Sequence, residues 1–165
     1  MGTVNAAAAT QSLITRHDVD AVIFSGIAGG LNPALHIEDV VIGSTLRYLD
    51  TDTALIAESA PGLEEFASTP ELVEVAASVL EARGYVPAGK EQGAPDDTAP
   101  LQYLPGVIAT GDRFVGDAAL KEVVIAATQA DCVEEYDALS ARSFDLEDYA
   151  RRASGIVLDI LRRIG

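Results

Sequence analysis

The amino-acid sequence predicts an α/β fold, a three-layer αβα domain built around a central mixed sheet. Short apolar runs rich in β-branched residues alternate with longer segments whose apolar residues recur at helical spacing. Clusters of glycine, proline and aspartate separate these segments and predict the turns between them. The chain has 165 residues, of which 48% are hydrophobic and 22% charged, as is typical of a globular domain. We therefore expect one domain over residues 1–165, with a flexible excursion at 86–100.

Four segments are predicted to form helices from their composition, their apolar spacing and their flanking residues. They cover residues 3–16, 69–83, about 117–129 and 143–164. The first is rich in alanine, which favours the helix and permits close packing. At the second, Thr69 can cap the helix, Pro70 suits its first position and Gly84 can end it. Asp117 can cap the third helix in the same way.

Four apolar segments are predicted to form strands. They cover residues 21–25, 39–44, 106–110 and 131–135. We expect the first, AVIFS, to be buried, and the glycine turn FSGIAGGL follows at its end. The stretch 48–68 shows no clean period and predicts a loop with short pieces of structure. Proline, glycine and aspartate dominate 86–100, which is expected to be a loop within the domain.

The charge and the cysteine count exclude several classes of partner. The formal net charge is −15 and no basic stripe offsets it, so we expect neither a nucleic-acid partner nor an anionic membrane. Cys132 is the single cysteine, so the chain has no disulfide framework, which fits a reducing cytoplasm. The start of the sequence lacks the basic-then-apolar pattern of a signal peptide. We therefore expect a cytoplasmic protein.

Taken alone, several conspicuous residues favour a structural interpretation. The turn FSGIAGGL is neither a P-loop nor a G-x-G-x-x-G fingerprint, and a loop rather than a helix is expected after it. His17 and His36 lie far apart without carboxylates at ligand spacing, so no metal site is expected. Cys132 has no obvious catalytic partner and is predicted to be a buried small residue.

Two other segments leave binding and structural roles open. In ATGDRFVG a strand ends in Thr-Gly-Asp, where Phe114 can either stack on a flat ring or cover the core. The main chain of Val115 is free to bond to the edge of such a ring. The segment DCVEEYD places Glu134, Glu135 and Asp137 after an apolar pair. Their carboxylates can bind sugar hydroxyls, act as acid or base, or form a solvated turn.

Taken together, the segments resemble one family. GTVNAAAATQ, DAVIFSGIAGGLNPALHIEDVVIG, RYLDTD, GVIATGDRFVG and CVEE occur in the order seen in the purine nucleoside phosphorylase/nucleosidase superfamily. The ending SFDLEDYARRASGIVLDILRRI is similar to that family's terminal helix. Within the superfamily the sequence looks most like the methylthioadenosine/S-adenosylhomocysteine nucleosidases. The resemblance extends over nearly all of the chain apart from 86–100.

The resemblance implies a reaction and a set of binding residues. It implies that water displaces adenine from its ribose, without a cofactor, in a protein that forms homodimers. Ala28 and Gly29 would line the ribose side of the pocket, and Glu134 matches the first glutamate of the family's Glu-Met-Glu strand. Phe114 would stack on the adenine, the main chain of Val115 would bond to its edge, and Phe144 would close the purine wall.

Departures from the family pattern leave the catalytic groups unassigned. The family's first strands, with the glutamate that activates water, have no counterpart here, and Tyr136 replaces the second glutamate of Glu-Met-Glu. The strand ending in the Ser-Asp general acid is also missing between CVEE and SFD. We therefore expect a chain truncated at its N-terminus and internally deleted. Glu134 and Asp137 are the candidates for catalysis.

Whether the chain is an enzyme therefore stays open at this point. One alternative is a non-catalytic protein that still binds nucleosides or another partner. A second is a purine nucleoside phosphorylase, which needs basic or hydroxyl groups near the glycine turn. Ile27 occupies the turn where a hydroxyl would help, and GTVNAA carries no basic residue, so hydrolysis is favoured over phosphorolysis.

Overall fold

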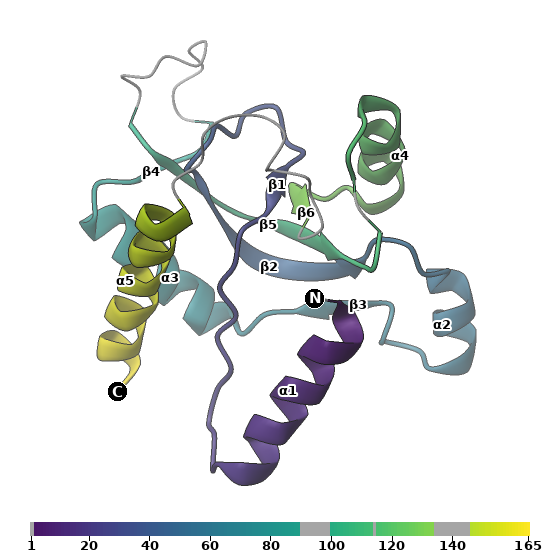
Figure 1. The fold of residues 1–165 in the computed structure, drawn as a ribbon, viewed down its shortest axis with the longest axis horizontal. Coiled ribbons are helices and arrows are strands. Elements are labelled where there is room, and N and C mark those ends of the chain that lie inside the picture. Colours follow the sequence, from purple (N-terminus) through teal and green to yellow (C-terminus); the bar gives the residue numbers. More distant parts are fainter. Residues whose placement is uncertain (1, 90–99, 114, 134–145) are drawn as a thin grey trace.

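A computed structural model describes residues 2–89, 100–113, 115–133 and 146–165 (Figure 1). In chain order the elements are α1 (Thr3–Arg16), β1 (Gly29–Gly30), β2 (Val40–Tyr48), α2 (Thr53–Ser59), β3 (Glu65–Ala67), α3 (Pro70–Ala82), β4 (Val86–Pro87), β5 (Gln102–Thr110), α4 (Ala118–Thr128), β6 (Cys132–Val133) and α5 (Leu146–Ile164). None of the helices in these described ranges is long and apolar enough to cross a membrane.

The described strands form one mixed six-stranded sheet. Its order is β1-β6-β5-β2-β3, and β4 pairs separately with β5. Strand β5 runs parallel to β2, β4 and β6, whereas β1 and β3 pair antiparallel with β6 and β2. In the register of these pairs Tyr48 lies opposite Thr110, and Val133 lies opposite Ala109. The carboxyl ends of β2, β5 and β6 therefore meet at one edge of the sheet.

Helices pack on the sheet through separate apolar clusters. On one side, α3 and α5 contribute Ala76, Val79 and Ile160 to a cluster that also contacts Ile42 of β2. A neighbouring cluster joins Leu80 to aromatic side chains. A third cluster joins α4 to the sheet, and its buried members are Leu31, Ala109, Val115, Val124, Ala130 and Val133. This arrangement is the three-layer α/β fold that the sequence predicts.

All four predicted helices are present, and their ends follow from local chemistry. Helix α1 covers Thr3–Arg16, as predicted. Thr69 is the residue before α3, although its side chain makes no capping bond, and Gly84 follows the helix at φ +88°. Asp117 caps α4, since its side chain accepts a hydrogen bond from Leu120 N at 2.7 Å. Helix α5 is described from Leu146, and residues 143–145 of its predicted range lie outside the described residues.

One predicted strand is wrong. Residues 21–28 form no strand, and Val22 and Phe24, predicted to be buried, are 57% and 72% exposed. The stretch runs from the end of α1 back to the sheet without a strand partner among the described residues (Figure 1). A run of β-branched residues expresses only a preference, and a strand forms only when a neighbour pairs with its main chain.

The other predicted strands and loops are close to the observed elements. Strands β2 and β5 are both longer than predicted, and β6 includes only Cys132 and Val133 of the described residues. The stretch 48–68 contains α2 and β3 as its short pieces of structure. At the start of the predicted excursion 86–100, Val86–Pro87 forms β4 beside β5. Residues 90–99 lie outside the described part of the chain.

Candidate functional site

The glycine turn includes β1, which pairs with β6, the strand directly before Glu134 in the chain. Gly29 pairs antiparallel with Val133, and Gly30 with Cys132. Gly29 is buried by this pairing, whereas Ala28, the residue before it, is exposed. The turn is therefore fixed at the carboxyl edge of the sheet, and Ala28 presents a methyl group and bare main chain to the surroundings.

The turn after β5 lies at the same edge of the sheet, because Val115 packs in the core beside residues of that edge. The side chain of Val115 is 1% exposed and belongs to one apolar cluster with Leu31, Ala109 and Val133. Leu31 follows the glycine turn, and Ala109 and Val133 lie near the carboxyl ends of β5 and β6. The structure thus brings Ala28, Gly29 and Val115 to one edge, the usual position of ligand sites in open α/β sheets.

Four sequence-predicted site residues cannot be placed against this edge. Phe114, Glu134, Asp137 and Phe144 lie outside the described residues. Their predicted roles in stacking, ribose binding and acid–base chemistry therefore stay predictions. Val133, the last described residue of β6, is directly followed by Glu134 in the chain.

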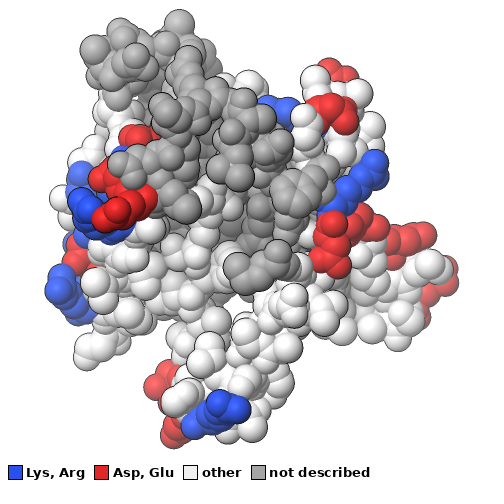
Figure 2. Space-filling model, viewed as in Figure 1, with Lys and Arg blue, Asp and Glu red and all other residues white. Residues whose placement is uncertain are grey.

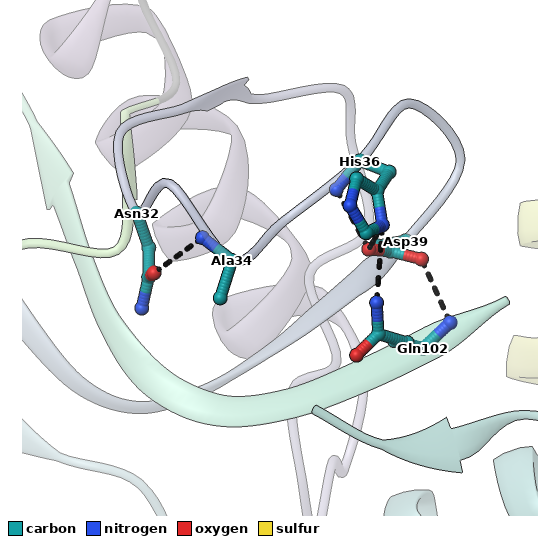
Figure 3. A network of polar contacts seen from close by, with 5 residues as sticks. All are labelled: Asn32, Ala34, His36, Asp39 and Gln102. Carbon is teal, nitrogen blue, oxygen red and sulfur yellow. Dashed lines mark hydrogen bonds and ion pairs between the residues drawn. The ribbon is translucent and has the colours of Figure 1, made fainter. Parts of the chain in front are cut away.

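The loop after the glycine turn is held at both ends by hydrogen bonds (Figure 3). At its start, Asn32 Oδ1 accepts a bond from Ala34 N at 2.9 Å. At its end, the Asp39 carboxylate accepts from His36 N and from Gln102 N, both at 2.7 Å. The Gln102 amide also lies 3.0 Å from His36 Nδ1. His36 is thus part of a loop anchor, and no group of three ligand-type side chains able to hold a metal occurs among the described residues.

Sequence reasoning missed Asp131, the residue just before β6. Asp131 Oδ1 accepts a bond from Asn32 Nδ2, and Oδ2 accepts one from Val107 N, each at 2.8 Å. Its carbonyl oxygen accepts from the amides of Leu31 and Asn32. The signal in the sequence is faint, an aspartate before CVEE and an Asn-Pro pair after the glycines.

A second set of missed contacts joins three of the quoted motifs at the start of α1. Asp112 Oδ1 accepts bonds from Thr3 N at 2.9 Å and from Thr3 Oγ1 at 3.1 Å. Asp112 N donates to Asp50 Oδ2 at 3.2 Å. A Cβ atom on Gly111 would lie closer than 3.0 Å to the Asp50 carboxylate. GTVNAA, RYLDTD and GDRFVG therefore meet, and a carboxylate lies at the positive end of α1.

An ion pair fixes the loop before β2 to α5. Arg152 Nη1 and Nη2 donate to the two carboxylate oxygens of Glu38 at 2.7 and 2.6 Å, and Arg152 also lies 3.0 Å from Asp148. The hydrogen bond from Arg152 lowers the pKa of Glu38. Glu38 has φ +79°, an uncommon conformation for a residue with a side chain, so this bidentate bond holds a strained position.

A cavity of about 570 Å³ lies between α5 and the first part of the glycine turn. Its lining is mainly apolar and is made by Ile23, Ser25, Gly26, Ile27, Tyr149, Ala150, Ala153, Ser154, Val157 and Leu158. Burial raises the pKa of Tyr149, which favours its neutral hydroxyl in this lining. The exposed stretch 21–28 therefore covers an incompletely filled space.

Comparison with known proteins gives one family. The sequence profile of the phosphorylase superfamily matches residues 1–135. The chain is 33% identical over 123 residues to the 5′-methylthioadenosine/S-adenosylhomocysteine nucleosidase of Chromohalobacter salexigens, over 72% of this chain and 46% of that protein. It is 36% identical over 121 residues to the same-named protein of Bacillus cytotoxicus, over 71% of this chain and 46% of that protein. The chain thus spans about half the length of the curated relatives it matches.

Solved structures agree with the sequence relatives. The nucleosidase of Neisseria meningitidis in complex with methylthio-immucillin-A superposes with a TM-score of 0.63 at 29% identity, over 84% of this chain and 55% of that one. A futalosine hydrolase mutant of Helicobacter pylori superposes with a TM-score of 0.75 at 24% identity, over 99% and 77% of the two chains, and shows likeness of fold. These matches agree with the mixed sheet and with the pairing of the glycine turn with β6. The chain belongs to the phosphorylase superfamily.

Proposed function

We propose that the chain is of the nucleosidase type and binds an adenine nucleoside at the carboxyl edge of β5 and β6. The reaction is hydrolysis of the N-glycosidic bond, with methylthioadenosine or S-adenosylhomocysteine as the substrate class. The observation that carries the proposal is the glycine turn paired with β6 and joined to Val115 by one apolar cluster. Sequence relatives named as nucleosidases for these two compounds support the same substrate class.

The proposed binding mode uses main chain more than side chain. Ala28 and Gly29 face the ribose, where the lack of large side chains permits close approach. The main chain of Val115 bonds to the base edge, while its own side chain stays in the core. Phe114 and Phe144 cover the base, and Glu134 bonds to ribose hydroxyls. These last three roles rest on the resemblance alone.

In the proposed reaction the bond between the anomeric carbon and the base nitrogen breaks. The oxygen of a water molecule bonds to that carbon, one proton of the water is lost, and the departing adenine gains a proton. Positioned proton transfer contributes roughly 10²–10⁴-fold to such a rate. Glu134 and Asp137 are the candidates for it within this chain.

The alternative of phosphorolysis rests on one observation. Lys121 Nζ donates to Gly30 O at 3.1 Å, so a cation does lie beside the glycine turn. A phosphorylase needs such a charge to hold phosphate. Hydrolysis is the preferred proposal because Ile27 occupies the turn where a hydroxyl would help to hold phosphate, and GTVNAA carries no basic residue.

The test is adenine release from methylthioadenosine by the purified chain, followed by chromatography with and without phosphate. Release above the buffer blank in both solutions supports hydrolysis, and release only with phosphate supports the phosphorylase. Calorimetric binding without release supports a non-catalytic nucleoside-binding protein. The proposal fails when neither release nor binding occurs.

A matched pair of variants locates the site. Ala28→Leu places a larger side chain on the proposed ribose face and is expected to weaken calorimetric binding of methylthioadenosine at least tenfold. Ala7→Leu enlarges another exposed alanine, on α1, and is expected to leave binding unchanged. Equal binding by both variants would remove Ala28 from the site.

We also propose that the chain works as a cytoplasmic homodimer. The three residues of the edge strand β3 are all exposed, and an open sheet edge favours association. Apolar side chains of α1 are exposed as well, among them Val4 and Leu13. Sedimentation equilibrium measures the assembly, and a monomer at micromolar concentration would contradict the proposal.

A further inference from the structure

Asp131 bonds to the residues that follow the glycine turn through its main chain. Its carbonyl oxygen accepts from Leu31 N at 2.8 Å and from Asn32 N at 3.1 Å. These bonds continue the pairing of Gly29 and Gly30 with β6. The exit of the turn is therefore held by the residue just before that strand.

The side chain of Asp131 joins the same turn to the neighbouring strand. Oδ1 accepts from Asn32 Nδ2, and Oδ2 accepts from Val107 N in β5, each at 2.8 Å. In return, Asp131 N donates to Val107 O at 2.8 Å. One half-buried carboxylate thus bonds through one oxygen to the exit of the glycine turn and through the other to β5.

Gly106 provides the space for this carboxylate. A Cβ atom at position 106 would lie closer than 3.0 Å to Asp131 Oδ2. Such a contact forces the carboxylate to move, because real Cβ atoms do not approach an atom so closely. The absence of a side chain in the middle of β5 therefore has a specific reason, and the reason is Asp131.

We propose that Asp131 is the positioning residue that sets the distance between the glycine turn and the turn carrying Val115. This inference rests on the proposed function, since it assigns a role within the same nucleoside site. Ala28 and Gly29 belong to one wall of that site and Val115 to the other. Hydrogen bonds to an ionised acceptor are stronger than those between neutral groups, so one carboxylate can hold both walls at one spacing.

The decisive variant is Asp131→Asn, because an amide can accept at only one of the two positions. Losing one such bond corresponds to about a tenfold change in an equilibrium constant. We expect the amides of Leu31, Asn32 and Val107 to exchange hydrogen about tenfold faster, while those of α3 are unchanged. We also expect the dissociation constant of methylthioadenosine, measured by calorimetry, to rise about tenfold.

Asp52→Asn is the matched control. The Asp52 carboxylate also accepts from two main-chain amides, at the start of α2, which has no buried residue. Both amides bond to the same oxygen, and Asn caps a helix as well as Asp, so this variant should leave the unfolding temperature, the nucleoside affinity and the exchange at Leu31 nearly unchanged. Equal affinity in the two variants, or faster exchange spread evenly over the sheet, would overturn the positioning role.

A double variant separates positioning from crowding. Gly106→Ala is expected to reproduce the fast exchange at Leu31 and Asn32, because the new methyl group displaces the carboxylate. Adding Asp131→Ala relieves the crowding and should raise thermal stability above that of Gly106→Ala alone, although not to that of the unmodified chain, and it should not restore slow exchange. Restored slow exchange would overturn the inference. If the unmodified chain binds no nucleoside, the proposed function fails, while hydrogen exchange still decides whether Asp131 holds the turn.

Discussion

Helices α1 and α3 have nearly the same length but opposite surroundings. Helix α1 has no buried residue, whereas α3 buries Ala76, Val79 and Leu80 against α5 and the sheet. Alanine-rich sequence favours a helix by itself, but most helical stability in proteins comes from packing an apolar face. The comparison shows that a correct helix prediction says nothing about whether the helix is packed.

The surface of α1 is unusual for a helix without buried residues. The whole chain has a net charge of −15, but α1 carries only one charged side chain, that of Arg16. Figure 2 shows α1 at the bottom of the view as a mostly uncharged projection. It is linked to the sheet through Thr3 and Asp112 at its first turn. The position of α1 therefore depends on the polar contact between Thr3 and Asp112, whereas the position of α3 depends on apolar packing.

The largest effect is expected for Leu80→Ala in α3. Leu80 is 1% exposed beside Tyr85 and Tyr103, so its truncation leaves a cavity and costs about 2–5 kcal/mol of unfolding free energy. Leu13→Ala on α1 is the counterpart, because Leu13 is 57% exposed and should change stability by less than about 0.5 kcal/mol. Urea denaturation measures both, and equal losses would break the comparison.

A smaller loss is expected for Tyr103→Phe, which removes a hydroxyl from the packed region. Tyr103 Oη donates to Glu81 Oε1 at 2.7 Å, and this bond, with burial, raises the pKa of Tyr103 above its ordinary value of 10.0. Removing the bond costs about 1 kcal/mol at neutral pH. The contribution is complete below pH 10 and is lost as the pH rises through the raised pKa. A difference that persists undiminished well above that pKa would contradict the assignment.

Asp112→Ala tests the attachment of α1. It removes the carboxylate that accepts from Thr3 N, and loss of such a cap costs about 0.5–2 kcal/mol of helix stability. We expect limited proteolysis to cleave residues 3–16 several-fold faster, with urea unfolding of the remainder changed by less than about 0.5 kcal/mol. Asp18→Ala, an exposed aspartate just after α1, serves as the control. Unchanged cleavage in Asp112→Ala would mean that other contacts hold the helix.

The smallest effect is expected for Glu38→Gln. The Arg152 bond lowers the pKa of Glu38 from its ordinary value of 4.5, so ionised Glu38 stabilises the fold above that pH. Both partners are more than one-third exposed, and solvent screening limits the loss at pH 7 to a few tenths of a kcal/mol. The difference should vanish as the pH falls through the lowered pKa of Glu38. Thermal unfolding between pH 2 and 7 measures it, and a pH-independent difference would contradict the ion-pair explanation.

Local sequence patterns predicted most elements because their causes are local. Helices 3–16 and 69–83 follow from alanine content, apolar spacing, Pro70 and Gly84. The strand expected at 21–25 is wrong because a strand needs a partner, and apolar composition does not specify one. The pairing of Gly29 with Val133 joins residues that are distant in sequence, so no local pattern contains it.

The candidate site stays a prediction, and the fold adds only where some of its residues lie. Resemblance placed Ala28, Gly29 and Val115 in one site, and the fold brings them to one edge of the sheet. It did not indicate Asp131 or Asp112. Their roles depend on hydrogen bonds to main chain from other elements, which a motif does not encode.

The bond between Thr3 and Asp112 also has a consequence for the order of assembly. The two residues are 109 positions apart in the chain. Strand β2 likewise cannot form its parallel pairing until β5 has been synthesised. At 5–20 residues per second, synthesis of that interval takes roughly 5–20 s. During this time α1 lacks the Asp112 anchor, and its surface, on which Arg16 is the one charged side chain, is open to chaperones and to other nascent chains. Helix α1 can thus reach its observed attachment only after the chain has been made as far as Asp112.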